Sequence, residues 1–240
     1  MSDRAHLLVR GSALEPVRRH RALADQMGER AHFVRLDVSK EAEWAAAIEE
    51  TESRFGPLSV LVNNAGVLSP SALIEDGDIA AWQHVIDTNL TGPYLGIRAA
   101  VPSLRRNGGG VIVNIASTSG HVGTAFIAPY VASKWGLRGL TRTAAIELGR
   151  DGIRVNSIDP GVVNTPLITE PLHPGAAPVS DYYSPEPFAI KRLADPQDIT
   201  NLLLFLASVQ ASFITGSEHV TDGGLLLGPA LADGQTQNRS

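Results

Sequence analysis

Residues 111–134, VIVNIASTSGHVGTAFIAPYVASK, decide the fold and the chemistry of this chain. The mainly apolar run from Val111 to Ile115 predicts a buried strand. Ser117 follows almost directly, and the carboxyl ends of strands are where open α/β sheets place their ligands. Tyr130 and Lys134 are four residues apart, so in a helix their side chains share one face. The three polar groups are therefore expected to meet at one carbonyl or hydroxyl group.

A phenol beside an ammonium group is a candidate acid–base catalyst. A free phenol has a pKa of about 10, and a nearby cation favours the phenolate. We therefore expect Lys134 to lower the pKa of Tyr130, so that the phenol can transfer a proton near neutral pH. A Tyr-x-x-x-Lys pair occurs by chance in many helices, so its meaning depends on the rest of the chain.

The composition fits a single α/β domain with a sizeable core, since 43% of the 240 residues are hydrophobic. The net charge of −5 predicts no general attraction for nucleic acid or an anionic membrane. Cysteine is absent, and the seven histidines show no ligand spacing, so we expect no metal. We find no bilayer-spanning apolar run and no signal-peptide pattern, and therefore expect a cytoplasmic protein.

Alternating helix and strand patterns run along the whole chain. We expect strands at residues 6–9, 32–37, 58–62, 111–115, 153–158 and within 214–224, and helices at residues 13–28, 41–55, 128–148, from Asp78 and from Asp195. Ser39 is a candidate N-cap for the helix of residues 41–55. In the helix from Asp78, Pro93 has no N–H, so the carbonyl of Asn89 loses its normal helical donor.

The hydroxyl, phenol and ammonium together resemble a known signature. Ser117 lies thirteen residues before Tyr130, and Tyr130-Val-Ala-Ser-Lys134 completes the Ser/Tyr-x-x-x-Lys pattern of classical short-chain dehydrogenases/reductases. The chain looks closest to the bacterial 3α/20β-hydroxysteroid dehydrogenase-like members. Further segments resemble family motifs in the same order: Leu36-Asp37-Val38, Asn63-Asn64-Ala65-Gly66, the Pro160–Pro166 loop and Asp222-Gly223-Gly224.

This resemblance implies an NAD(P)-dependent oxidoreductase that interconverts a secondary alcohol and a ketone, with a hydroxysteroid or similar hydrophobic substrate. The implied catalytic residues are Asn89, Ser117, Tyr130 and Lys134. The implied cofactor-binding residues are Asp37, Val38, Asn63, Ala65, Gly66, Tyr130, Lys134, Pro160, Gly161, Val163 and Thr165. Asp37 would meet the adenine, and Val163 and Thr165 would hold the nicotinamide carboxamide. Asn89 would complete a water relay to Lys134, and residues 170–188 take the place of the substrate lid.

The resemblance also favours NAD as the cofactor, with NADP as the alternative. It implies a homotetramer or homodimer, and a Rossmann-like domain of residues 1–228 followed by a flexible tail, 229–240. Arg10 is the nearest candidate for the residue that selects between NAD and NADP. On the helix of residues 128–148, Trp135, Leu140 and Ile146 are expected in the core or at a subunit interface.

The N-terminal region departs from the family. A dinucleotide fold begins with a strand, a Gly-rich turn and a helix. Here the turn reads Arg10-Gly11-Ser12-Ala13-Leu14-Glu15, with one glycine. The simplest alignment makes residues 6–10 the second strand of the family, so we expect a doubly wound parallel sheet without the first strand and helix. The other interpretation is a diverged first strand with a shortened crossover.

Two alternative functions remain at this point. The first alternative to a dehydrogenase is a non-catalytic protein with this fold, or a truncated gene product, that is unable to bind a dinucleotide and acts at most as an oligomer subunit. A serine hydrolase is the weaker alternative, because Ser117 lacks a Gly-x-Ser-x-Gly frame and His121 is too close in sequence to be assigned as its base.

Overall fold

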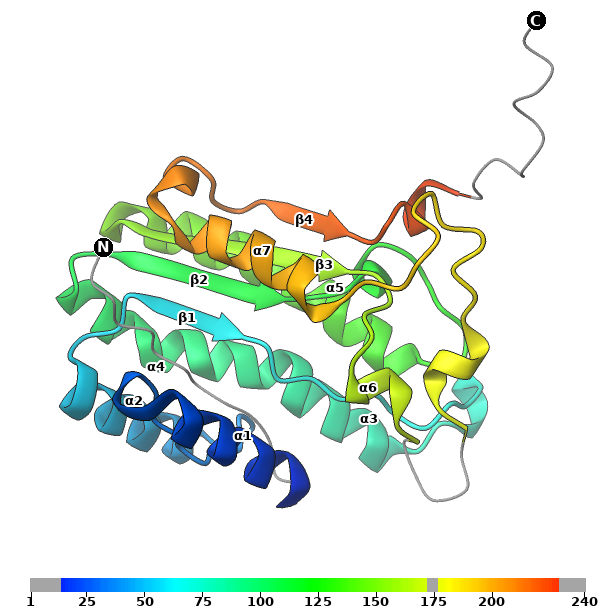
Figure 1. Ribbon diagram of the computed structural model, residues 1–240, viewed down its shortest axis with the longest axis horizontal. Helices are drawn as coiled ribbons and strands as arrows, with labels where there is room; N and C mark the ends of the chain where they lie inside the picture. The colour runs from blue at the N-terminus through cyan, green and yellow to red at the C-terminus, as the bar shows by residue number, and fades with distance from the viewer. Residues whose placement is uncertain (1–13, 172–176, 229–240) are drawn as a thin grey trace, which may run out of the picture.

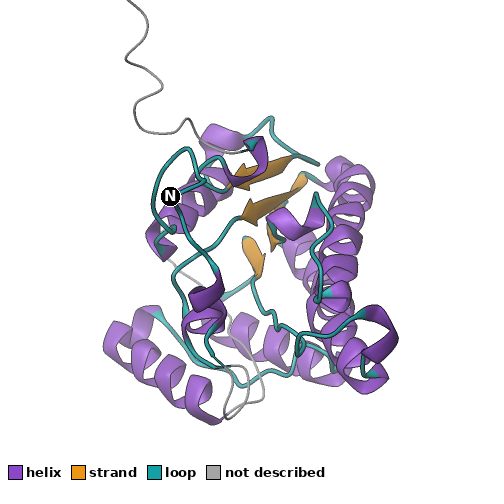
Figure 2. Ribbon diagram, turned by 90° about the vertical axis from the view of Figure 1, so that its right-hand side faces the viewer, coloured by secondary structure: helices purple, strands orange, loops and turns teal. Residues whose placement is uncertain are grey.

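A four-stranded parallel sheet is the centre of the computed structural model, which describes residues 14–171 and 177–228 (Figure 1). The strands lie side by side in sequence order: β1 (Val60–Asn63), β2 (Gly110–Ile115), β3 (Ile153–Pro160) and β4 (Glu218–Thr221). In the register, Val62 is the partner of Val113, which is the partner of Asn156. Because all four strands run the same way, their carboxyl ends meet at one edge. The predicted site residues follow at that edge, where Figure 2 shows loops crossing in front of the strands.

Helices cover both faces of the sheet, because successive side chains of a strand point to opposite sides. Ile112 of β2 packs into a core with residues of α2 (Glu41–Phe55), α4 (Gly92–Arg106) and α5 (Ala128–Leu148). Val111 and Val113 pack on the other face with Leu206 of α7 (Pro196–Ala207). This two-sided cover confirms the expected Rossmann-like parallel sheet.

The remaining helices are α1 (Leu14–Met27), α3 (Ile79–Ile86) and α6 (Pro166–Thr169), with single 3-10 turns at several connections. The predicted helices of residues 13–28, 41–55 and 128–148 are confirmed, as are those that start at Asp78 and Asp195. Both starts are capped: Asp78 accepts a bond from the Ala80 amide, and Asp195 forms a capping box with Asp198. None of the described helices is both long and apolar enough to span a membrane.

The helix that begins at α3 is interrupted where the sequence predicts. Residues Asp87–Thr91 form a π-helical turn between α3 and α4. Pro93 lies just beyond the turn and lacks the N–H that a regular helix would need there. The wider turn places Asn89, which is completely buried, against the sheet end.

Residues 32–37 form no strand, so that prediction is wrong. The backbone at the end of this segment is bonded to side chains of α2. The Trp44 indole donates to the Val38 carbonyl at 2.8 Å, and Glu43 accepts from the Asp37 amide at 2.7 Å. Ser39 is not the N-cap of α2 either, because that position is Lys40, and the Ser39 hydroxyl donates to Asp37.

β1 is an edge strand within the described part of the chain, pairing with β2 alone. Val62 and Asn63 at its end line a large cavity. The predicted strand of residues 6–9, the turn of residues 10–13, Arg10 within it, and the tail from residue 229 lie outside the described residues. The missing first strand therefore stays a prediction.

Candidate active site

A cavity of about 1780 Å³ opens at the carboxyl ends of the strands. Three of the four predicted catalytic residues line it: Ser117, Tyr130 and Lys134. The predicted cofactor-binding residues that line it are Val38, Asn63, Ala65, Gly66, Tyr130, Lys134, Pro160, Gly161, Val163 and Thr165. Asp37 lies outside the cavity, where its carboxylate accepts bonds from the Ser39 amide and hydroxyl.

Ser117 and Tyr130 are brought together by the turn after β2 and the first turn of α5. The Ser117 Oγ accepts from the Ser119 amide at 3.1 Å, and its own hydrogen is available for donation to Tyr130. Burial raises the pKa of Tyr130, and its bond with Ser117 acts in the opposite direction because it favours the phenolate. Tyr183 adds to the rise.

The expected lowering of the Tyr130 pKa by Lys134 is therefore wrong for the protein alone. The Lys134 Nζ lies 5.4 Å from the centre of the Tyr130 ring and donates to the Ile115 carbonyl at 2.8 Å. The cost of withdrawing the phenolate from water outweighs the stabilisation that its surroundings provide.

Lys134 is itself a perturbed group, with 4% of its surface exposed. Burial lowers its pKa to about 8, and the negative charge of Asp159 opposes that shift. An ammonium with this pKa is mostly charged at pH 7 and loses its proton within the range in which enzymes work.

Asn89 does not line the cavity but contacts residues that surround it. Its side-chain amide makes two bonds with the backbone of Val67, each 2.9 Å long, and donates to the Ser133 hydroxyl at 3.2 Å. Ser133 in turn donates to the Tyr130 carbonyl. Asn89 thus ties the loop after β1 to the helix that carries Tyr130 and Lys134.

A second buried chain of polar groups fixes the end of β1. The Asn63 amide donates to Asn114 at 2.8 Å, and Asn114 donates to Thr141 of α5 at 2.8 Å. Unpaired polar groups are costly in a core, so this chain holds the two strand ends and α5 in one arrangement. The start of the Asn63–Gly66 segment is therefore anchored to the sheet through Asn63.

The loop after β3 is packed closely against the last strand. A Cβ atom on Gly161 would lie 2.9 Å from the Cα of Asp222, so only glycine allows this approach. Backbone bonds from Asn164 to Ala194 and from Ala194 to Val162 hold the next residues. These contacts fix the position of the loop, in which Val163 and Thr165 line the cavity.

Sequence reasoning missed a charged cluster beside this site. The His121 Nε2 lies 2.5 Å from Asp159 Oδ2, so this ring nitrogen is bonded to Asp159 rather than to Ser117 as a hydrolase would require. Arg138 joins the same cluster and continues the four-residue spacing of Tyr130 and Lys134, a signal that the sequence did contain. His121 and Asp159 are 38 residues apart, so no local sequence pattern predicts that they pair.

Comparison with known proteins agrees with this geometry. A family model described as Enoyl-(Acyl carrier protein) reductase matches residues 5–226. A 3-alpha-(or 20-beta)-hydroxysteroid dehydrogenase of Mycobacterium tuberculosis is 43% identical over 215 residues, which are 89% of this chain and 78% of that protein. The chain belongs to the short-chain dehydrogenase/reductase family.

Other members of this family extend the comparison. Trans-4-hydroxycyclohexanecarboxylate dehydrogenase of Sinomonas cyclohexanicum is 44% identical over 201 residues, 84% of this chain and 73% of that protein. A solved structure described as ElxO with NADP bound superposes with a TM-score of 0.80 at 29% identity, covering 92% of this chain and 88% of that one. The chain is thus an oxidoreductase by family, and its named relatives are alcohol and hydroxysteroid dehydrogenases.

Proposed function

We propose that this short-chain dehydrogenase/reductase oxidises hydrophobic secondary alcohols to ketones with NAD(P), and catalyses the reverse reduction. The observation that carries the proposal is the convergence of Ser117, Tyr130 and Lys134 on one cavity. The same cavity is lined by the loops that the family uses for its cofactor.

The proposed roles follow from the chemistry of alcohol oxidation, which removes a proton from oxygen and a hydride from carbon. Tyr130 accepts the proton, and Ser117 donates a hydrogen bond to the substrate oxygen. NAD(P), when bound, supplies the hydride acceptor. Lys134 contributes positive charge next to the phenol, and Asn89 holds the helix that carries both residues. In the protein alone the pKa of Tyr130 is raised, which disfavours the phenolate. The positive charge of a bound oxidised nicotinamide would favour the phenolate.

The cavity fits a dinucleotide together with a substrate. Its volume of about 1780 Å³ exceeds the roughly 300–1000 Å³ of ordinary ligand sites. Val163 and Thr165 border it on one side, and Asn63 and Gly66 on another. We propose that these residues hold the nicotinamide and adenosine halves, respectively.

The apolar part of the cavity lining favours an apolar substrate. It includes the side chains of Leu68, Val122, Phe126, Leu167, Val179 and Leu226. One relative is named for a hydroxysteroid and another for a hydroxycyclohexanecarboxylate, and both names describe alcohols built on carbon rings. We therefore propose an alicyclic or steroid alcohol as the substrate class.

A non-catalytic role is the second candidate, favoured by two observations. Asp37 is turned to Ser39 rather than to the cavity, and β1 is an edge strand within the described residues. If the adenine and pyrophosphate side is incomplete, the chain would keep its fold without holding a cofactor.

Titration of the purified chain with NADH and NADPH, followed by nicotinamide fluorescence, separates the two candidates. Saturable binding at micromolar concentrations, followed by reduction of the oxidised cofactor with cyclohexanol or a 3α-hydroxysteroid, supports the dehydrogenase. No binding of either dinucleotide by a chain with a folded circular dichroism spectrum rejects it in favour of the non-catalytic role. The preferred cofactor also follows from the two titration curves.

A further inference from the structure

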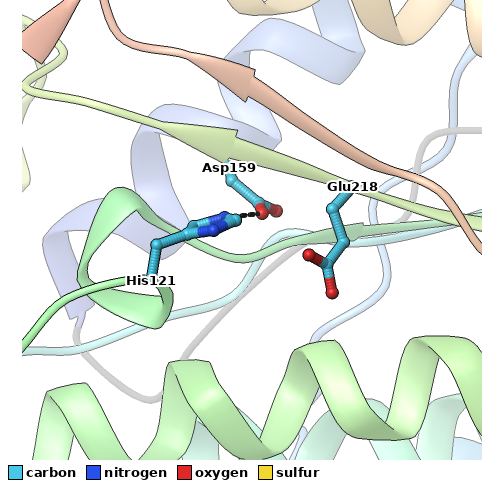
Figure 3. A group of neighbouring side chains, drawn as sticks. All are labelled: His121, Asp159 and Glu218. Atoms are coloured by element: carbon cyan, nitrogen blue, oxygen red, sulfur yellow. Dashed lines mark hydrogen bonds and ion pairs between the residues drawn. The ribbon is translucent and has the colours of Figure 1, made fainter. Parts of the chain in front are cut away.

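Three titratable side chains from three different elements converge beside the site (Figure 3). His121 follows the turn after β2, Asp159 lies near the end of β3, and Glu218 begins β4. Their possible ligand atoms all lie within 4.8 Å of one another, and Asp159 is completely buried.

Guanidinium groups surround this cluster and pair mainly with Glu218. The Arg138 Nη2 lies 2.5 Å from Glu218 Oε2, and its Nε lies 3.9 Å from Asp159 Oδ2. The Arg142 Nε lies 3.0 Å from the other Glu218 oxygen. Both guanidinium groups are paired with Glu218 at 3.0 Å or less, whereas Asp159 is hydrogen-bonded to His121, so the cluster is an ion-pair network rather than a metal site.

The network is connected to each part of the catalytic machinery. Arg138 lies one turn after Lys134 on α5 and also donates to the Gly120 carbonyl, in the turn that begins at Ser117. His121 follows that same turn. Asp159 directly precedes Pro160, where the loop toward Val163 begins. The contact between His121 and Asp159 therefore joins the Ser117 turn to the loop after β3.

We propose that Asp159 and His121 are positioning residues of the dehydrogenase: Asp159 balances the charge of the buried Lys134, and His121 holds Asp159 and the Ser117 turn in place. This inference rests on the proposed function for its kinetic consequences. Its electrostatic part concerns the protein alone.

The environment of Lys134 explains why a balancing charge is needed. Its hydrogen-bond partner is the neutral Ile115 carbonyl, and the charge that opposes the lowering of its pKa is that of Asp159. Asp159 Oδ2 is held by His121, while the buried Oδ1 has no hydrogen-bond partner. Such a carboxylate interacts strongly with charges around it because little water screens it. The titratable and charged groups around Lys134 and Asp159 are Tyr130 and Arg138 on α5, His121 after β2, and Glu218 and His219 on β4.

The three lysines of the chain, Lys40, Lys134 and Lys191, make a direct test possible. NMR titration of the lysine Cε–Hε signals, assigned with Lys40→Arg and Lys191→Arg, measures the Lys134 pKa without requiring turnover. We expect about 8 in the wild type. Asp159→Asn, which keeps the shape and removes the charge, should shift the titration to lower pH by about half a unit or more. Asp151→Asn, which removes a carboxylate at the opposite end of β3, is the control and should leave the titration within experimental error.

The kinetic test uses His121. His121→Leu removes the group that holds Asp159 Oδ2, so we expect kcat for alcohol oxidation to fall about tenfold. His121→Gln keeps an N–H that reaches Asp159 and should restore most of that loss. In Asp159→Asn the alkaline limb of the kcat/KM profile should move to lower pH, following Lys134.

The outcomes distinguish this inference from the proposed function. A chain that does not bind dinucleotide contradicts the dehydrogenase, while the lysine titration still tests Asp159. A Lys134 signal that titrates at the same pH in Asp159→Asn and in the wild type overturns the electrostatic role. If Asp159→Asn does not fold, the His121 variants decide: equal kcat in His121→Leu and the wild type overturns the positioning role.

Discussion

At Lys134 the requirements of folding and of catalysis oppose each other. Burial lowers its pKa from 10.5 to about 8, so between these values the unfolded chain binds more protons than the folded one. Stability linked to this group is therefore reduced below pH 8 and recovers as the pH rises toward 10.5. The protein retains a costly buried charge next to Tyr130, as active sites commonly do.

Lys134→Met should therefore stabilise the chain while impairing turnover. A shift of about 2.5 units corresponds to about 3 kcal/mol, and loss of the bond to the Ile115 carbonyl offsets about 1 kcal/mol. We expect a gain of about 1–3 kcal/mol in unfolding free energy at pH 7 that disappears near pH 10.5. Urea denaturation at both pH values measures it, with the exposed Lys191→Met as the control. A Met variant less stable than the wild type at pH 7 contradicts the prediction.

The Tyr130 hydroxyl should matter for turnover and little for folding. Tyr130→Phe removes the proton acceptor, and general acid–base groups typically contribute about 10²–10⁴-fold in rate. The ring stays in place, so the unfolding free energy should change by about 1 kcal/mol or less. Cofactor reduction followed at 340 nm and urea denaturation measure the two effects. An active Phe variant would rule out the proposed mechanism.

At the scale of the elements, α4 approaches α2 and the end of β1 so closely that one methyl group decides the packing. A Cβ atom on Gly96 would lie 2.7 Å from Trp44 Cη2 and 2.8 Å from Asn63 Oδ1. The indole is fixed by its bond to the Val38 carbonyl, and Asn63 by its bond to Asn114. Neither neighbour is able to move without breaking a buried hydrogen bond.

Gly96→Ala should therefore destabilise the protein by about 1–3 kcal/mol, despite the higher helix propensity of alanine. The matched control is Gly139→Ala on α5, where no atom lies within 4 Å of the added methyl group. That substitution should be neutral or stabilising by up to about 1 kcal/mol. Chemical denaturation of the two variants compares them, and equal effects would show that propensity rather than packing governs both.

The elements also show what the sequence predicts and what it does not. The apolar runs at β1, β2 and β3 predict buried parallel strands correctly. A continuous apolar run indicates burial on both faces of a sheet, whichever strands lie beside it. Residues 32–37 have an alternating apolar pattern but form no strand, and the backbone at the end of the segment, Asp37 and Val38, is bonded to side chains of α2. Within the site, Ser117, Tyr130 and Lys134 follow from local spacing. The pairing of His121 with Asp159 spans 38 residues and arises from the sheet register, which the sequence does not display.

At the scale of the whole molecule, the edge strand β1 also forms part of the cavity wall. β1 ends in the Asn63–Gly66 loop at the cavity wall, and its second edge has no partner strand among the described residues. The part of the proposed site that contains Ser117, Tyr130 and Lys134 lies among β2, β3 and α5. Dinucleotide binding therefore depends on the wall beside β1, which makes the NADH and NADPH titrations the decisive measurement for the chain as a whole.

The outer surface suggests how whole molecules associate. The contacting helices α3 and α5 expose large apolar side chains: Ile79 is 78% exposed, Ile146 is 84% exposed, and Trp82 and Trp135 are also exposed. Large exposed apolar residues on neighbouring helices are typical of subunit interfaces. We therefore expect a homo-oligomer in which α5 contributes to the interface.

Ile146→Glu should shift the assembly toward smaller species. A symmetric interface contains the substitution twice, so each contact would bring two like charges into an apolar surface. Sedimentation velocity at tens of micromolar protein measures the shift, with circular dichroism to confirm the fold. Ala46→Glu, at an exposed position of α2, adds the same charge elsewhere and should leave the oligomer unchanged. A monomeric wild type, or an Ile146→Glu variant that sediments like the wild type, would exclude this part of α5 from the interface.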